Sequence, residues 1–134
     1  MIGELPENLV RVLLDTLPCE FTLIDAQDRI VAWNHHDHRL FLRPLELAQT
    51  DVRGCHPQRV RGEVESLLAR LKSGETDRVR VWTTSSVGVS RDKRKVVVEY
   101  CALRGPAGEY LGCVEYGQDL TELQSLSGEK RTRD

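Results

Sequence analysis

The fold of this chain is decided by residues 95–121, which comprise KVVVEYCALR (95–104), GPAG (105–108) and EYLGCVEYGQDLT (109–121). Two runs rich in β-branched and aromatic residues flank a Gly/Pro turn, and this pattern predicts a long antiparallel hairpin. After the second run, Asp119-Leu120-Thr121-Glu122 marks a change from strand to a helix-like tail. Either Asp119 or Thr121 can cap this tail or tie it to the sheet, because both side chains accept hydrogen bonds from free backbone N–H groups.

The turn also sets the predicted register of the hairpin. A four-residue turn at 105–108 pairs Tyr100 with Cys113 and Val98 with Glu115. One face then carries Val96, Val98, Tyr100, Ala102, Leu111, Cys113 and Glu115, and the other carries Val97, Glu99, Cys101, Leu103, Tyr110, Val114 and Tyr116. Neither face is mostly polar, so both faces of the sheet need a cover. The two glutamates lie on opposite faces and therefore do not form an acid–base pair.

Length and charge limit the classes of function. The chain has 134 residues, enough for one domain with one core, and its net charge of −2 comes with scattered basic residues. No apolar run approaches the roughly 20 residues of a membrane span, and no signal peptide is visible at the N-terminus. Cys19, Cys55, Cys101 and Cys113 are far apart, which indicates reduced thiols. We therefore expect a cytoplasmic protein that binds neither nucleic acid nor membrane.

The other segments complete an α+β pattern. In chain order they are predicted as a helix (6–17), two short strands (21–25 and 30–34), an irregular stretch with short helical pieces (34–51), a helix (57–73), a strand (78–87) and a polar loop (88–94). Pro57 suits the first turn of the second helix, which places His56 near its N-cap. Antiparallel strands separated by a helical middle give an α+β domain.

The first predicted helix has apolar residues on more than one side. These residues are Leu9, Val10, Val12, Leu13, Leu14 and Leu17. A helix that packs against one surface needs only one apolar stripe. Two interpretations remain open: the helix covers the outer sheet face and also contacts a partner, or it packs into a single deep groove.

Several short segments resemble one family. They are Thr16-Leu17-Pro18, Asp25 with Asp28-Arg29, Arg39-Leu-Phe-x-Arg43-Pro44, Gly54-Cys55-His56-Pro57, Lys72-Ser-Gly74, Trp82, Tyr100-x-Ala102-x-Arg104, Gly108-Glu-Tyr-Leu-Gly112, Glu115, Gln118-Asp119-x-Thr121 and Gly128-Glu-Lys-Arg131. In this order and spacing, the chain resembles the PAS-type sensory domain that follows hemerythrin-like domains in bacterial and archaeal proteins. The resemblance implies the PAS fold, a five-stranded antiparallel sheet with helices on one face and an N-terminal flanking helix. It also implies three parts: a flanking helix (1–17), the PAS domain (18–121) and a C-terminal signalling tail (122–134).

Histidines and cysteines are the first candidates for chemistry. His56 lies where the helix begins, and a histidine on or near this helix holds heme in some PAS domains; the alternative is a helix cap. Cys55 adjoins the same helix end, where a thiolate is stabilised, although buried inert cysteines are more common. His35, His36 and His38 form a dense cluster, yet structural zinc sites usually need four ligands, so solvated loop histidines are the favoured interpretation.

The expected function is therefore a sensory module rather than an enzyme. No nucleophile–base arrangement, phosphate-binding glycine loop or metal motif is visible in the sequence. The candidate ligand-binding residues are Cys55, His56, Trp33, Tyr100 and Glu115, and the candidate signal-relay residues are Gln118, Asp119 and Thr121. One alternative is a heme- or flavin-binding sensor, and another is a ligand-free dimerisation scaffold. We also expect a homodimer formed through helix 6–17 and the outer sheet face.

Overall fold

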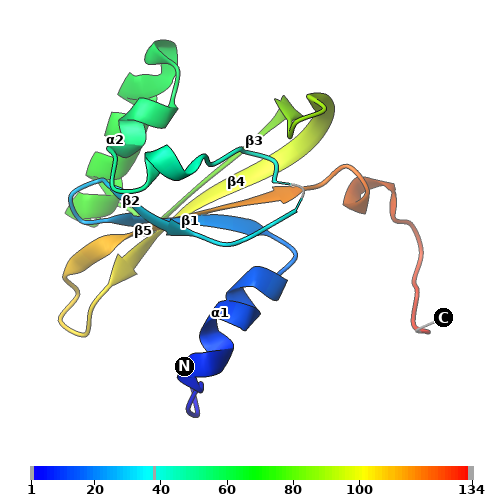
Figure 1. Ribbon diagram of the computed structural model, residues 1–134, viewed down its shortest axis with the longest axis horizontal. Coiled ribbons are helices and arrows are strands. Elements are labelled where there is room, and N and C mark those ends of the chain that lie inside the picture. The colour runs from blue at the N-terminus through cyan, green and yellow to red at the C-terminus, as the bar shows by residue number, and fades with distance from the viewer. Residues whose placement is uncertain (1, 38, 133–134) are drawn as a thin grey trace.

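A computed structural model describes residues 2–37 and 39–132 of the chain. Its centre is an antiparallel sheet of five strands in the order β2-β1-β5-β4-β3 (Figure 1). The strands are β1 (Glu20–Asp25), β2 (Ile30–Trp33), β3 (Arg78–Val87), β4 (Asp92–Arg104) and β5 (Tyr110–Asp119). The predicted hairpin forms β4 and β5, and β5 is the central strand. The α+β class and the five-stranded antiparallel sheet are confirmed.

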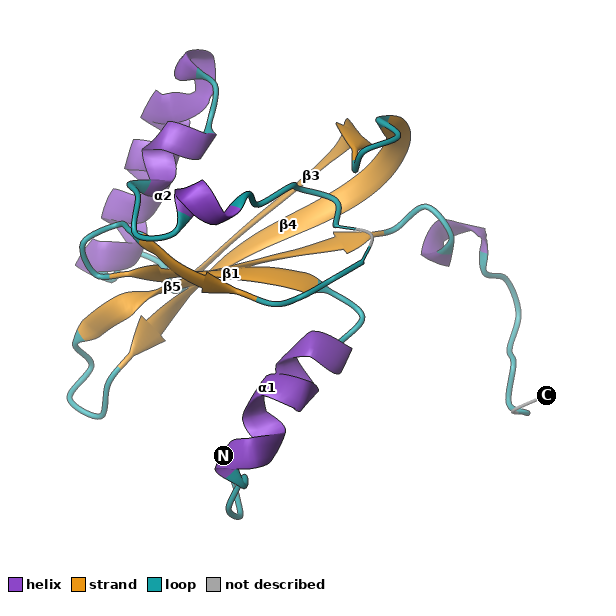
Figure 2. Ribbon diagram, viewed as in Figure 1, coloured by secondary structure: helices purple, strands orange, loops and turns teal. Residues whose placement is uncertain are grey.

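The helices are short and lie outside the sheet (Figure 2). They are α1 (Glu7–Thr16), α2 (Arg61–Ser73) and four 3-10 turns, η1 (Leu45–Leu47), η2 (Val52–Cys55), η3 (Gln58–Val60) and η4 (Leu123–Ser125). None of the helices in the described ranges is long and apolar enough to cross a membrane.

The core lies between α2 and one face of the sheet, which we call the inner face. α2 buries Leu68 and Leu71 completely, and these pack with Ile24, Val98 and Cys113 of the sheet. Gly74 ends α2 in the left-handed conformation (φ 78°), which glycine adopts without the steric cost that a Cβ brings.

The register of the hairpin differs from the prediction by two residues. Tyr100 pairs with Glu115, not with Cys113, and Val98 pairs with Gly117, not with Glu115. The prediction missed an irregularity between Leu103 and Arg104, where the strand partners jump from Gly112 to Tyr110. A shift of two residues keeps the side chains beyond this irregularity on their predicted faces, because side chains alternate along a strand.

At the irregularity, two neighbouring side chains lie on the face opposite to the predicted one. Tyr110 packs against the core, whereas the side chain of Leu111 is 54% exposed, the reverse of the prediction. Gly112 follows with φ 144°, and a Cβ there would stand 2.2 Å from the carbonyl oxygen of Ile24. The close approach of β1 therefore requires glycine at this position.

Two predicted boundaries were also wrong. α2 begins at Arg61 after the 3-10 turn η3, so His56 does not cap it and instead ends η2. Residues 88–94 are not all loop: β4 already begins at Asp92, and only 88–91 turn between β3 and β4.

The outer face of the sheet has no helix against it in the described parts of the chain. Figure 1 shows α1 projecting from the sheet, and none of the residues of α1 is buried. The side chains of Leu9, Val12 and Leu13 are 48%, 61% and 44% exposed. Of the two sheet faces that were predicted to need a cover, only the inner face is covered by a helix.

Candidate functional site

A pocket of about 520 Å³ lies on the inner face at the end of β5, away from α2. We call it the sheet-end pocket. His36, Asp37, Leu40 and Leu42 form one wall, the turn between β3 and β4 forms another, Gln118 and Asp119 of β5 form a third, and Gly117 lies in the floor. Neither α2 nor any of the ligand-binding residues expected from the sequence lines this pocket.

The deepest charged group of the pocket is Glu20, the first residue of β1. Its side chain is 5% exposed. One carboxylate oxygen accepts from the backbone N–H of Leu40 at 2.7 Å, and the other accepts from that of Phe41 at 2.9 Å. Glu20 therefore holds the backbone of Leu40 and Phe41 over the end of the sheet.

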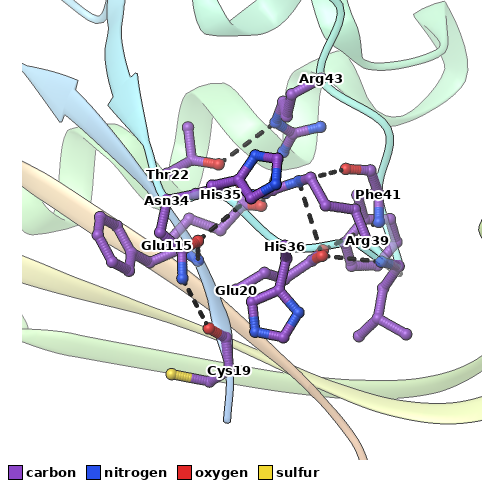
Figure 3. A network of polar contacts seen from close by, with 12 residues as sticks. Cys19, Glu20, Thr22, Asn34, His35, His36, Arg39, Phe41, Arg43 and Glu115 are labelled. Atoms are coloured by element: carbon purple, nitrogen blue, oxygen red, sulfur yellow. Dashed lines mark hydrogen bonds and ion pairs between the residues drawn. The ribbon is translucent and has the colours of Figure 1, made fainter. Parts of the chain in front are cut away.

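Arg39 lies beside Glu20 (Figure 3). Its side chain is 10% exposed, and its Nε stands 3.7 Å from the Glu20 carboxylate. Nε donates to the carbonyl of Phe41 and Nη1 donates to the carbonyl of Asn34 at 2.7 Å. Burial lowers the pKa of Arg39, with the neighbouring charges as smaller influences, but a guanidinium stays protonated in proteins. The pocket thus has a fixed positive charge in its floor.

Asn34 connects this floor to α1. Its buried side-chain nitrogen donates to the carbonyls of Leu14 (3.1 Å) and Cys19 (2.9 Å), and its oxygen accepts from the backbone N–H of Phe21 (2.9 Å). The same oxygen accepts from Arg39. One side chain therefore joins α1, β1 and the pocket.

A second buried ion pair, between Arg43 and Glu115, lies on the inner face of the sheet. Arg43 Nη2 donates to Glu115 Oε1 at 3.0 Å, and Arg43 Nε donates to the hydroxyl of Thr22 (Figure 3). Tyr100 pairs with Glu115 across the hairpin. Burial raises the pKa of the Tyr100 phenol, and the negative charge of Glu115 raises it further. Glu115 Oε2 has no hydrogen-bond partner among the described residues.

His56 belongs to the same interior cluster. Burial lowers the pKa of its imidazole, while the charge of Glu115 acts in the opposite direction. Its buried Nε2 has no hydrogen-bond partner in the part of the chain described. Three predicted ligand-binding residues, His56, Tyr100 and Glu115, are therefore brought together, but around the Arg43 ion pair and not around the sheet-end pocket.

The remaining predicted ligand-binding residues have structural surroundings. Cys55 donates to the carbonyl of Val52, and burial raises the pKa of its thiol, so the structure favours the inert cysteine over the stabilised thiolate. Trp33 packs against the core cluster opposite Thr22 of β1. Arg43 and Glu115 lie close enough to influence the pKa of both Cys55 and His56, and heme binding by His56 stays a prediction.

His35 and His36 have different surroundings. His35 Nε2 lies 3.2 Å from the Asp37 carboxylate, and both side chains are exposed. His36 Nε2 lies 3.2 Å from the carbonyl of Leu17, and His36 lines the sheet-end pocket. His38 lies outside the described residues. Across residues 2–37 and 39–132, no group of three or more His, Cys, Asp or Glu is arranged to hold a metal ion.

The predicted relay residues meet at the rim of the pocket. Asp119 accepts from the backbone N–H of Thr121 at 2.8 Å and pairs with Arg94 at 3.0 Å. The Thr121 hydroxyl accepts from the backbone N–H of Lys95. Neither residue caps η4, which has no side-chain cap. Gln118 and Asp119 also line a smaller pocket of about 260 Å³ beside Leu123 of the tail.

Sequence reasoning missed Glu20, Arg39 and Asn34 as site residues. Glu20 is a charged residue at the start of an apolar strand, and that contrast was the available signal. Arg39 and Arg43 stand in the segment Arg39-Leu-Phe-x-Arg43-Pro44, which was noted only for its resemblance to the family. Their partners lie 19 and 72 residues away in sequence, so spacing did not reveal them.

Comparison with known proteins agrees with this fold. A family model described as PAS domain matches residues 10–121. A C-terminal domain from Streptococcus mutans is 28% identical, with a TM-score of 0.82 over 95% of this chain and 94% of that one. The PAS domain of BvgS from Bordetella pertussis is 17% identical, with a TM-score of 0.59 over 87% of this chain and 90% of that one. The Vibrio cholerae VqmA dimer without target DNA is 15% identical, with a TM-score of 0.65 over 96% of this chain and 59% of that one. Among curated proteins, none matches.

The fold and the family match together define the class: this chain belongs to the PAS domain family, whose members are sensory and signalling modules. The link to hemerythrin-like domains stays a prediction.

Proposed function

We propose that the chain is a non-catalytic sensory domain that binds a small molecule in the sheet-end pocket and passes the change to its C-terminal tail. One observation carries the proposal: the pocket that has the buried Glu20–Arg39 pair in its floor also has Asp119, the residue that holds the tail, in its wall. Its volume of about 520 Å³ falls within the roughly 300–1,000 Å³ typical of ligand sites. A ligand there contacts both the fixed floor and the tail junction.

Gly117 allows a direct test, because it lies in the floor of the pocket. A Cβ at this position would stand 3.5 Å from the ring of Phe41 and 3.6 Å from Glu20, which is ordinary contact. Gly117→Ala should therefore fold and bind, whereas Gly117→Val places two more methyl groups into the floor. Small molecules that co-purify with the protein should be identified by native mass spectrometry of all three proteins. We expect a bound species in the original and the Ala variant that is absent from the folded Val variant; a species that survives Gly117→Val refutes the location.

We also propose that the domain self-associates through α1 and the outer sheet face, in the cytoplasm, where its four free cysteines stay reduced. The support is exposed apolar surface: Val12 of α1 is 61% exposed, and Trp82 of β3 is 65% exposed. The VqmA neighbour is a dimer.

Mass in solution tests this association. Val12→Glu and Trp82→Glu should each convert a dimer to a monomer in light scattering, whereas Arg11→Glu, an exposed change on the same helix, should not. If the unmodified chain is monomeric at high concentration, this part of the proposal is wrong.

A further inference from the structure

We infer that β3 is a docking edge for an extended, acidic peptide segment of another protein, which joins the sheet as a further strand. β3 is the outermost strand on its side of the sheet, and within the described ranges it pairs with β4 alone (Figure 2). The other side of its backbone therefore presents hydrogen-bond donors and acceptors to a partner. The inference goes beyond the proposed function, because it concerns the margin of the sheet, and β3 contributes only Val87 to the sheet-end pocket.

The edge of β3 is long and regular. Every residue from Arg78 to Val87 pairs with β4 in one continuous register, without a bulge. The strand contains neither proline nor glycine, and residues 81–87 (VWTTSSV) carry no charge. Natural proteins protect open edges with short strands, bulges, prolines or charged side chains. Because β3 lacks these devices beyond Arg80, an added strand can follow it without a break.

Apolar side chains are exposed on both sides of this edge. Val81 pairs with Val98 of the inner face and is 45% exposed, whereas Val98 is buried, so the cover of the inner face ends before β3 here. On the outer face, Trp82 pairs with Val97 and is 65% exposed. A strand beside β3 brings its own side chains against both residues, because facing side chains of neighbouring strands have Cβ atoms roughly 5 Å apart. This favours a peptide with apolar residues at two successive positions.

The outer face beside the edge is cationic. Arg78 and Arg80 stand on this face of β3. Lys93 and Lys95 of β4 lie on the same face as Glu99, because side chains alternate along a strand. In these two strands, both fully described, Glu99 is the one acid on that face. The margin of the sheet therefore has an excess of positive charge.

Glu99 does not remove this excess, because it is already committed to the sheet. Its side chain is 1% exposed, and its two oxygens lie 2.9 Å from Nε of Arg78 and 2.9 Å from Nε of Arg80. The Tyr116 hydroxyl also donates to it, at 2.7 Å. One carboxylate balances only one of two guanidinium charges. The arginine side chains remain 64% and 56% exposed, so carboxylates of a partner can reach them from solvent.

These features define the chemistry of the partner. In antiparallel pairing, the residue opposite Trp82 comes first, and the residues opposite Arg80 and Arg78 follow two and four positions later. The residues between them face Val81 and Val79 on the inner face. The matching pattern is therefore apolar, apolar, acidic, apolar, acidic. A second copy of β3 matches less well, because it brings its own cationic face beside this one.

Synthetic peptides separate backbone pairing from charge. The probe is acetyl-Ser-Leu-Val-Glu-Val-Glu-Ser-amide, and a second peptide replaces both glutamates by lysine. Two further probes carry backbone N-methyl groups either on the leucine and both glutamates or on both valines. Because the N–H groups of alternate residues point to opposite sides of a strand, one of these sets blocks pairing with β3 and the other faces away.

Binding to the full chain is followed by ¹⁵N–¹H NMR titration, with the amides of residues 78–86 as the local reporters. We expect the glutamate probe to shift these amides and the lysine probe to leave them unshifted. Of the two methylated probes, one should bind and the other should not. The titrations are repeated in Val12→Glu, so that self-association through α1 does not compete for the outer face.

Variants assign the contacts within the chain. Arg80→Gln should weaken binding of the glutamate probe by about 2- to 5-fold, as the loss of an exposed ion pair does. Val81→Lys places a charge in the apolar margin, a device that natural edges use against strand addition, and should remove the shifts. Arg59→Gln, which changes an exposed arginine of η3 outside the sheet, is the matched control. If Arg80→Gln does not fold, the lysine probe tests the same charge without altering the protein.

The other outcomes overturn the inference. If both methylated probes bind as the unmethylated one does, or if single-stranded oligothymidylate shifts the reporter amides and the peptides do not, the surface attracts anions without adding a strand. If these amides shift with protein concentration alone and Val81→Lys stops the shift, the edge belongs to a second copy and the acidic partner is wrong. None of these results bears on the sheet-end pocket, which Gly117→Val tests separately.

Discussion

Replacing Asn34 by alanine should release α1 and destabilise the whole domain. The Asn34 side chain makes three hydrogen bonds to backbone groups and accepts a fourth from Arg39. Neutral hydrogen bonds contribute about 0.5–1.5 kcal/mol each, and bonds to charged groups about 1.5–3 kcal/mol. Because the bond from Arg39 is long, at 3.3 Å, and the bonds share atoms, we expect a total loss of about 3–4 kcal/mol.

Much of that loss comes from groups left without partners. Asn34 is 2% exposed, so the N–H of Phe21 loses its acceptor where water has little access. A domain of this size is stable by about 5–15 kcal/mol, so the variant should remain folded with a much lower urea midpoint and an unchanged m-value. α1 should also fray, because a helix of 10 residues without tertiary contacts is marginal in water.

Urea unfolding and hydrogen exchange measure the two effects separately. The control is Asn8→Ala, which replaces an exposed asparagine in α1 itself. A stability loss below 1 kcal/mol, or unchanged exchange within residues 7–17, would refute the view that Asn34 anchors this helix.

Three further predictions concern the titratable groups and the tail. Glu99 accepts from the Tyr116 hydroxyl and pairs with Arg80, and these contacts lower its pKa below 4.5. Its contribution to the stability of the domain is therefore present above that pH and lost as the pH falls. Glu99→Gln should flatten the fall in urea midpoint between pH 5 and 3. Burial lowers the pKa of His56 below 6.5, so protonation of this imidazole favours unfolding. His56→Gln should therefore reduce the stability that is lost between pH 7 and 5. If stability falls with pH as steeply in this variant as in the unmodified chain, His56 is not a buried neutral imidazole. Asp119→Ala removes the acceptor of the Thr121 N–H, a hydrogen bond worth about 0.5–2 kcal/mol by analogy with helix caps. Hydrogen exchange should become faster in residues 121–127, while residues 95–118 stay protected. Equal acceleration in both ranges would assign Asp119 a structural role.

The strands and their faces were predictable because they depend on local patterns. Alternation along 95–118 assigned Glu99 and Glu115 to opposite faces, and a two-residue error in register preserves such assignments. The exchange of Tyr110 and Leu111 was not predictable in this way, because it depends on the irregularity between Leu103 and Arg104. That irregularity has no signature in the turn sequence.

The site was harder to predict than the fold. Glu20 is held by the backbone N–H groups of Leu40 and Phe41, and backbone donors exist at every non-proline residue, so the sequence does not show which ones a buried acid will meet. His56, Tyr100 and Glu115 were chosen as ligand contacts by type and were found together. Their polar groups surround Arg43, a residue that the chemical reasoning had not considered.

The arrangement of the pocket constrains how a signal travels. Pro18, which follows α1, and Asp119, which holds the tail, line both pockets, so the two flanking segments of the domain meet at one place. A ligand changes the tail only if it binds the two tail states with different affinity, and linkage makes that coupling reciprocal. The ratio of the ligand's affinities for the two tail states should therefore equal the factor by which the ligand changes the opening equilibrium of the tail. A ligand that merely fills the pocket gives a factor of one in both measurements, so only a factor that differs from one in both supports signalling through the tail.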